Sequence, residues 1–123
     1  MQNKPFRFGP VALTTTTTTN ILNCNVTSLA GPTGFTATQP YVLLTHVRVV
    51  NKTGGAATFS LWLGATGANT AGTEVIGQGL SVAANSYVDW YGRLYLSNAD
   101  FLVGGASANT TLTIEGEGEI GFQ

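Results

Sequence analysis

The chain has 123 residues, and charged residues make up only 9% of it, against about a quarter in an ordinary soluble protein. Its formal net charge is −1, which excludes the clustered positive charge that nucleic-acid binding requires. Cys24 is the single cysteine, which excludes an intrachain disulfide and a thiolate metal site. We therefore expect one domain, with part of its sparsely charged surface covered by partners or by other copies of the chain.

Residues 1–12 are expected to form an extended arm, followed by one domain over residues 13–123. Pro5 and Pro10 disfavour helix. The arm residues most able to hold a neighbour are Lys4, Phe6, Arg7 and Phe8. No apolar run follows these charges and no stretch approaches the ~20 apolar residues of a membrane span, so we expect synthesis in the cytoplasm and no membrane partner.

Between residues 11 and 25 the chain contains a run of threonines, Thr14 to Thr19. Because threonine is β-branched and favours extended backbone, one or two strands near a sheet edge are predicted here. Residues 30–40 are rich in Gly and Pro and predict a loop.

The strongest strand signal covers residues 41–51. One face would carry Tyr41, Leu43, Thr45, Val47 and Val49, and the other Val42, Leu44, His46, Arg48 and Val50. Both faces are partly apolar, which favours a central strand. A turn at residues 51–55 and a return strand at residues 57–63 predict a hairpin, with Trp62 on the face opposite Phe59 and Leu61.

Further short strands are predicted along the second half of the chain, at residues 74–76, 80–82, 87–91, 93–96 and 100–104. The last strand, residues 111–122, alternates without a break. Its core face would hold Leu112, Ile114, Gly116, Gly118, Ile120 and Phe122, and its outer face Glu115, Glu117 and Glu119. About eight to nine short strands without an amphipathic helix predict an all-β fold, an antiparallel β-sandwich or jelly roll.

Sequence motifs for cofactor binding, metal binding or catalysis are weak in this chain. Residues 116–121 match G-x-G-x-x-G, but no helix follows to receive a pyrophosphate, so no cofactor is expected. The row Glu115, Glu117 and Glu119 lacks the looped oxygen cage of a calcium site, and we expect a solvated or salt-bridged face rather than a metal site. His46 is the single histidine and no nucleophile motif is present, so no enzymatic activity is expected.

Aromatic side chains are the remaining signal, namely Trp62, Tyr87, Trp90, Tyr91 and Tyr95. Exposed Trp and Tyr side chains are typical of interfaces and of sugar-stacking platforms. Burial of some of them in the core is the other interpretation, because small β-sandwiches commonly bury a Trp.

Over residues 40–122 the chain resembles capsid decoration (cement) proteins of tailed bacteriophages. The resemblance is carried by residues 49–64, with the Asn-Lys-Thr-Gly-Gly turn and the Leu-Trp-Leu strand, by residues 79–91, and by residues 94–104. It implies a β-sandwich or jelly-roll subunit, usually trimeric, that binds the major capsid protein on the outside of the shell and stabilises it.

The expected function is therefore that of a structural virion protein, made in the host cytoplasm and located on the capsid exterior. Its contact residues for the capsid or for other subunits would be the arm residues together with Arg48, Trp62, Arg93, Glu115, Glu117 and Glu119. Two alternatives stay open. One is a carbohydrate- or receptor-binding module of a tail or head fibre that uses Trp62, Trp90 or Tyr91, and the other is a head–tail or tail component.

Overall fold

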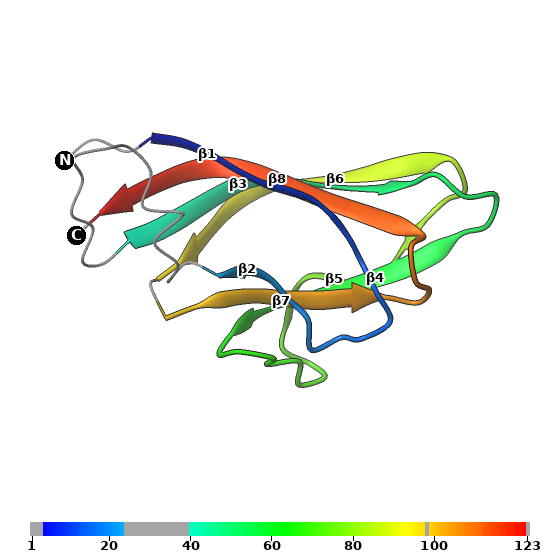
Figure 1. Cartoon of the computed structure of the whole chain (residues 1–123), viewed down its shortest axis with the longest axis horizontal. Helices are drawn as coiled ribbons and strands as arrows, with labels where there is room; N and C mark the ends of the chain where they lie inside the picture. The colour runs from blue at the N-terminus through cyan, green and yellow to red at the C-terminus, as the bar shows by residue number, and fades with distance from the viewer. Residues whose placement is uncertain (1–3, 24–39, 98, 123) are drawn as a thin grey trace.

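The computed structural model describes residues 4–23, 40–97 and 99–122. These residues form two packed four-stranded sheets and contain no helix (Figure 1). The strands are β1 (Lys4–Ala12), β2 (Asn20–Asn23), β3 (Pro40–Asn51), β4 (Ala57–Gly64), β5 (Glu74–Val82), β6 (Ser86–Leu96), β7 (Phe101–Ala106) and β8 (Leu112–Phe122). Sheet A has the order β1-β8-β3-β6 and sheet B the order β2-β7-β4-β5. The predicted all-β sandwich is confirmed.

The chain is wound from its two ends inward. The first strand pairs with the last, β2 with β7, β3 with β6, and β4 with β5, all antiparallel. This is the winding of a jelly roll. All successive strands except β4 and β5 lie in different sheets, so neighbours within a sheet come from distant parts of the sequence.

The core lies between the sheets, and β8 shows how the sequence builds it. Leu112, Ile114 and Ile120 are buried on its inner face, as the alternation predicts. Gly116, on the same face, leaves room for the ring of Phe8, which packs directly over it. Full burial of one such aliphatic or aromatic side chain contributes roughly 1.5–3 kcal/mol, so this face anchors the strand. The side chain of Phe122 lies outside the described residues.

The segment predicted as an arm is extended, but over residues 4–12 it is the edge strand β1 of sheet A, paired with β8. Phe8 is 7% exposed and belongs to the core, and Phe6 packs against the core. Burial of these rings holds the segment in the sheet, so it is part of the sandwich rather than a separate arm.

Strand β3 does not keep the two faces expected from simple alternation. Its register with both neighbours shifts between Leu44 and His46. The exposed Thr45 is an extra residue relative to β8, whereas relative to β6 the extra residue lies in β6, where Gly92 and Arg93 stand opposite Thr45. The core face therefore changes phase: it takes Val42 and Leu44 before the bulge and Val47 and Val49 after it. His46 and Arg48 lie on the outer face, as a β-bulge of one residue requires.

The predicted hairpin at residues 51–55 is wrong, because β3 lies in sheet A and β4 in sheet B. The connection is an arch between the sheets, held by the buried Asn51. Its amide Nδ2 donates to the carbonyl oxygens of Gly55 (2.9 Å) and Val82 (3.1 Å), and its Oδ1 accepts from the backbone N–H of Thr53 (2.9 Å). A buried amide with all of these partners specifies the arch.

Of the predicted region 11–25, the described part contains the last residues of β1 and the edge strand β2 of sheet B. The threonine run itself forms no strand; it lies against β7, where the N–H of Ala106 donates to the carbonyl of Thr14 (2.8 Å). The loop predicted at residues 30–40 lies outside the described residues except for Pro40, which begins β3, and Cys24 lies outside them as well.

The short strands predicted in the second half join into longer ones. Residues 74–76 and 80–82 belong to the single strand β5, and residues 87–91 and 93–96 belong to β6. The predicted strand at residues 100–104 is β7. The breaks in the pattern reflect irregular backbone: Gly77 and Gly79 have positive φ in β5, and the β6 register shifts opposite Thr45.

Gly118→Ala should destabilise the fold, because a Cβ there would lie 2.9 Å from the Leu43 carbonyl carbon and from Leu44 Cα, both backbone atoms of a paired strand. We expect a loss of roughly 1–3 kcal/mol in the free energy of unfolding and a fall in Tm of at least about 3 °C, measured by circular dichroism. Gly54→Ala is the matched control, since no atom lies within 4 Å of its added Cβ. Equal Tm values for the two variants would contradict this packing.

Candidate functional site on the outer face of sheet A

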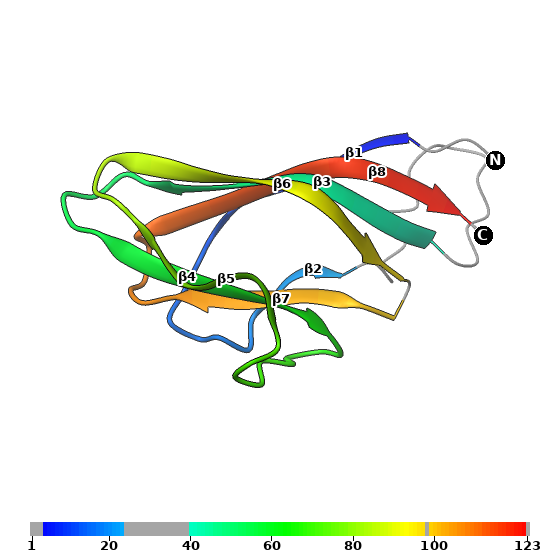
Figure 2. The same ribbon diagram turned by 180° about the vertical axis from the view of Figure 1, so that it is seen from behind.

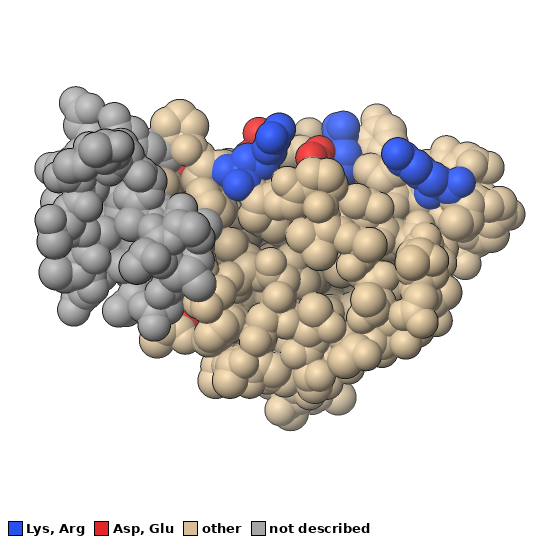
Figure 3. All heavy atoms as spheres, in the orientation of Figure 1, with Lys and Arg blue, Asp and Glu red and all other residues tan. Residues whose placement is uncertain are grey.

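Charged side chains are concentrated on sheet A. Figure 3 shows the blue and red atoms gathered along the edge that sheet A occupies in Figure 1, above an almost uncharged body. Glu74 is the single charged residue on the strands of sheet B as the structure describes them. The outer face of sheet A, called the ionic face below, is made of Arg7, His46, Arg48, Asp89, Glu115, Glu117 and Glu119.

The register of the strands places these residues in rows across the sheet. Arg7 on β1, Glu117 on β8, His46 on β3 and Tyr91 on β6 are direct neighbours in turn. The next row contains Glu115, Arg48 and Asp89. Directly opposed side chains of antiparallel strands lie about 4.5–5.5 Å apart at Cβ, so charges of opposite sign meet within each row.

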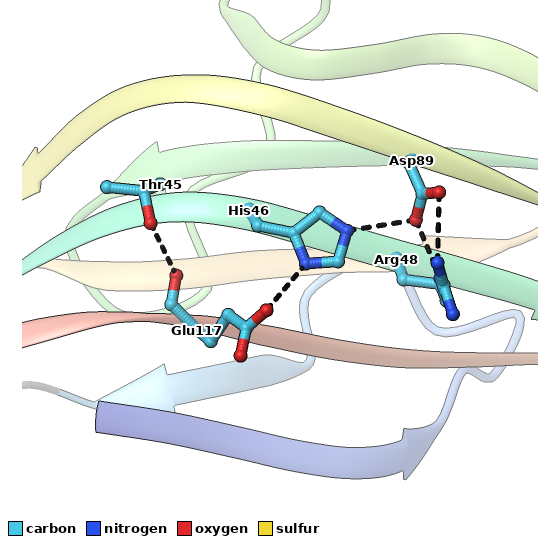
Figure 4. A network of polar contacts seen from close by, with 5 residues as sticks. All are labelled: Thr45, His46, Arg48, Asp89 and Glu117. Atoms are coloured by element: carbon cyan, nitrogen blue, oxygen red, sulfur yellow. Dashed lines mark hydrogen bonds and ion pairs between the residues drawn. The ribbon is translucent and has the colours of Figure 1, made fainter. Parts of the chain in front are cut away.

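Asp89 is the centre of the ionic face (Figure 4). Its Oδ1 and Oδ2 accept hydrogen bonds from Arg48 Nε (2.7 Å) and Nη2 (3.1 Å), and its Oδ1 lies 2.9 Å from His46 Nε2. The hydrogen bonds from Arg48, and then from His46, stabilise the carboxylate and lower the pKa of Asp89 to about 2. The same bond to Asp89 raises the pKa of Arg48. Such bidentate charged pairs fix geometry as well as charge.

His46 bridges two carboxylates. Its Nδ1 lies 3.1 Å from Glu117 Oε1, on the side of the ring opposite the contact with Asp89. A neutral imidazole carries one N–H and can donate to one of these carboxylates, whereas the imidazolium donates to both. The imidazole of His46 therefore joins side chains of β8, β3 and β6.

Three tyrosines of β6 stand along the border of the ionic face, and each is supported by a side chain from β3. Tyr91 stacks on His46 with ring centroids 4.7 Å apart and planes inclined by 22°. Arg48 Cζ lies 4.6 Å from the ring centroid of Tyr87, and the rings of Tyr95 and Tyr41 are 5.7 Å apart. Tyr87, Tyr91 and Tyr95 nevertheless remain 56%, 72% and 49% exposed. Aromatic side chains held in this way are pre-organised for contact.

The ionic face contains one shallow hollow of about 110 Å³, lined by Arg7, His46, Glu115, Gly116 and Glu117. A second hollow, of about 210 Å³, lies on sheet B beside Thr17, Thr58 and Ser107. Pockets for small-molecule ligands usually hold about 300–1,000 Å³. Hollows of this size suit single side chains of a partner.

Of the contact residues predicted from the sequence, the structure brings together Arg48, Glu115 and Glu117, with Arg7 and Glu119 beside them. Arg93 is exposed on β6. Two predictions are wrong: Phe8 is buried, and Trp62 is 6% exposed. The Lys4 side chain lies outside the described residues.

Trp62 is buried on the outer side of sheet B because the loop after β4 covers it. Its Nε1–H donates to the carbonyl of Thr70 (3.1 Å), and Asn69 of the same loop donates to the hydroxyl of Thr17 (2.8 Å). The loop and the threonine run thus join over this face. An indole with a satisfied N–H under two connected segments is a packing residue rather than an exposed platform.

Sequence reasoning missed Asp89 as the partner of Arg48 and His46, and it left open whether Tyr87 and Tyr95 are exposed or buried, which the structure answers as exposed. One signal was present: in Tyr87-Val-Asp-Trp-Tyr91 the polar and phenolic side chains alternate with apolar ones, which puts Asp89 on the same face as two tyrosines.

The stability that Asp89 contributes should depend on pH. Because its folded pKa, about 2, lies below the ordinary 3.8, this contribution is complete above about pH 4 and is lost as the pH falls towards 2. Chemical unfolding at pH 6 and at pH 2.5 should therefore show a smaller difference between wild type and Asp89→Asn at the lower pH. Glu119→Gln changes an exposed side chain, so its free energy of unfolding should differ little from that of the wild type at pH 6 and at pH 2.5. A wild-type advantage over Asp89→Asn that stays constant with pH would contradict the role of this carboxylate.

Models of known protein families give no match to this chain, and no curated protein sequence matches it. No helix among residues 4–23, 40–97 and 99–122 is long and apolar enough to cross a membrane. Within the same ranges, no three His, Cys, Asp or Glu side chains are grouped to hold a metal ion. The function is accordingly inferred from the geometry of the surfaces.

Proposed function

We propose that the protein is a structural virion protein, a decoration or cement subunit that binds the major capsid protein on the outside of a tailed-phage shell as a homotrimer. The observation that carries this proposal is the ionic face: a broad sheet surface on which Arg48 pairs with Asp89, His46 bridges Asp89 and Glu117, and the bordering tyrosines are held by side chains of β3.

A paired surface of this kind supports adhesion to another protein. Ionised groups that keep their partners lose less on desolvation than isolated charges do. Tyrosine and arginine are enriched among the residues that carry binding energy in protein interfaces. A subunit that prefers the assembled shell over free capsid protein stabilises the shell by mass action, without any chemical step.

The same geometry argues for binding rather than catalysis. The charged groups of Asp89, Arg48 and His46 are directed at each other, and the hollow beside them has a volume of about 110 Å³. The jelly roll recurs in viral capsid domains, but also in lectins, so the fold alone does not decide the function. We infer a non-enzymatic role that needs no cofactor.

Arg7→Glu should weaken binding to expanded capsids of the phage that encodes the chain, prepared from particles lacking this protein. Arg7 is exposed on the ionic face, in the row that also contains Glu117 and His46. A glutamate at this position would lie beside Glu117 and would face a capsid surface that is complementary to a positive charge. We expect a loss in affinity on the order of tenfold or more, measured by co-sedimentation.

Lys52→Glu makes the same change of charge at an exposed residue of the arch and should bind like wild type. Equal capsid affinity of the wild type, Arg7→Glu and Lys52→Glu would show that the ionic face does not bind the capsid. Failure of the wild type to bind these capsids would reject the decoration function.

A carbohydrate- or receptor-binding module is the second candidate, and the observation that favours it is Tyr91, which is 72% exposed with its ring stacked on His46. The buried Trp62 cannot serve as a platform, and Trp90 packs against the core. If this candidate is correct, the wild type should bind a glycan on a glycan array. Tyr91→Ala should abolish that binding, and Tyr41→Ala should retain it. An array without any bound glycan would reject it.

A further inference from the structure

The ionic face carries an excess of negative charge along β8. In Figure 2, as in Figure 1, sheet A is the upper layer and sheet B the lower one, so this face points away from the core. Asp89 is neutralised by Arg48 at 2.7 Å. Of the residues that define the face, three glutamates of β8 and the guanidinium of Arg7 remain, three negative charges against one positive, which gives a net charge of −2 when His46 is neutral. The formal charge of the whole chain is only −1, so the excess is local to this strand.

The hollow of the ionic face lies against this strand. It has a volume of about 110 Å³ and is lined by Arg7, His46, Glu115, Gly116 and Glu117. Glu115 and Glu117 are two positions apart on β8, which places their Cα atoms about 6.6–6.8 Å apart with both side chains on the outer face. Two carboxylates therefore flank one hollow, and His46 forms a further wall.

The two carboxylates are incompletely paired. The Oε1 atom of Glu117 contacts His46 Nδ1 at 3.1 Å, and the carboxylate makes no other hydrogen bond or ion pair with the described part of the chain. Glu115 lies opposite Arg48 in the register, but Nε and Nη2 of Arg48 both donate to Asp89 instead. Glu115 is half-buried and has no ion pair within the described ranges. A carboxylate that is partly removed from water without a counter-charge gains from meeting a cation.

We propose that this hollow accepts an arginine side chain of a protein partner, with the guanidinium between Glu115 and Glu117. The identity of that partner, the major capsid protein, rests on the proposed function. The choice of arginine rests on the charge and the size of the hollow.

A guanidinium fits the chemistry of the hollow. It is always charged and presents its N–H donors in a planar fork, so it can donate to two carboxylates at once. A lysine ammonium has the same charge but is compact and strongly hydrated, so it loses more on leaving water. A calcium ion needs about six to eight oxygen ligands, more than two carboxylates supply. The volume of about 110 Å³ suits one side chain rather than a longer segment.

Arg7 at the rim of the hollow determines which partners can enter. Its side chain is exposed and makes no ion pair with the glutamates of β8 in the described residues. Because two guanidinium groups repel each other, a partner arginine in the hollow needs an acidic neighbour opposite Arg7. The face thus selects a partner segment that carries both signs in this order and disfavours a uniformly basic surface.

The first test is an NMR titration of the full chain with acetyl-arginine amide, a probe whose single charge is the guanidinium. The side-chain carboxyl carbons of Glu115 and Glu117 should shift and saturate, with a dissociation constant on the order of 10 mM. Glu115→Gln keeps the shape of the side chain and removes its charge, so it should weaken binding of the probe at least about fivefold.

Glu119→Gln is the matched control, since it removes the same charge from an exposed residue of β8 that does not line the hollow. It should bind the probe within about twofold of the wild type. Acetyl-glutamine amide, which is neutral, should leave the carboxyl carbons unshifted, and the backbone amide spectra check that each variant is folded. A wild type without saturable shifts, or equal probe affinities of Glu115→Gln and Glu119→Gln, would overturn the proposal.

The second test is co-sedimentation with the same expanded capsids. Glu115→Gln should lose affinity on the order of tenfold, whereas Glu119→Gln should lose less than about threefold. A wild type that binds the probe through Glu115 but binds no capsids would reject the decoration function and retain the arginine hollow. Capsid binding that Glu115→Gln leaves unchanged would reject the hollow as the contact and retain the decoration function.

Discussion

The extra residue at Thr45 is the constraint on which both the core and the ionic face depend. Before it, even-numbered residues of β3 point inward; after it, Val47 and Val49 do. Without this shift His46 and Arg48 would point between the sheets, where an unpaired charge is costly, and two valines would face water. One bulge therefore separates apolar from charged side chains in a strand whose sequence mixes them.

The last strand could be predicted from sequence because its pattern is local and unbroken. Leu112 and Ile114 alternate with Thr113 and Glu115, so the pleat alone assigns the faces. The bulge in β3 could not be predicted, since it is a mismatch with β8 and β6, which lie more than 40 residues away in the chain. The arch was mistaken for a hairpin because turn residues are the same in both; the buried hydrogen bonds of Asn51 distinguish them.

The residues of the candidate site could be predicted from sequence where they lie on a single strand. Contacts between residues of different strands could not be predicted. The glutamate row follows from the alternation of β8, and Arg48, which lies opposite Glu115, was identified as a contact residue. The pairing of Arg48 with Asp89 joins residues 41 positions apart, and the sequence alone does not encode that register. Trp62 was misassigned for a related reason, since the loop that contains Thr70 covers it from outside the sheet.

The molecule presents surfaces of different chemistry, which bears on how it would assemble. Charges that are paired within sheet A lose less on burial than isolated ones, so the ionic face can meet a polar partner and be released from it. The tyrosines of β6 add exposed aromatic area beside these charges, so the outer face of sheet A offers both polar and aromatic contacts. The strands of sheet B, as described, carry one charged residue, Glu74, so the two outer faces of the sandwich suit partners of different chemistry.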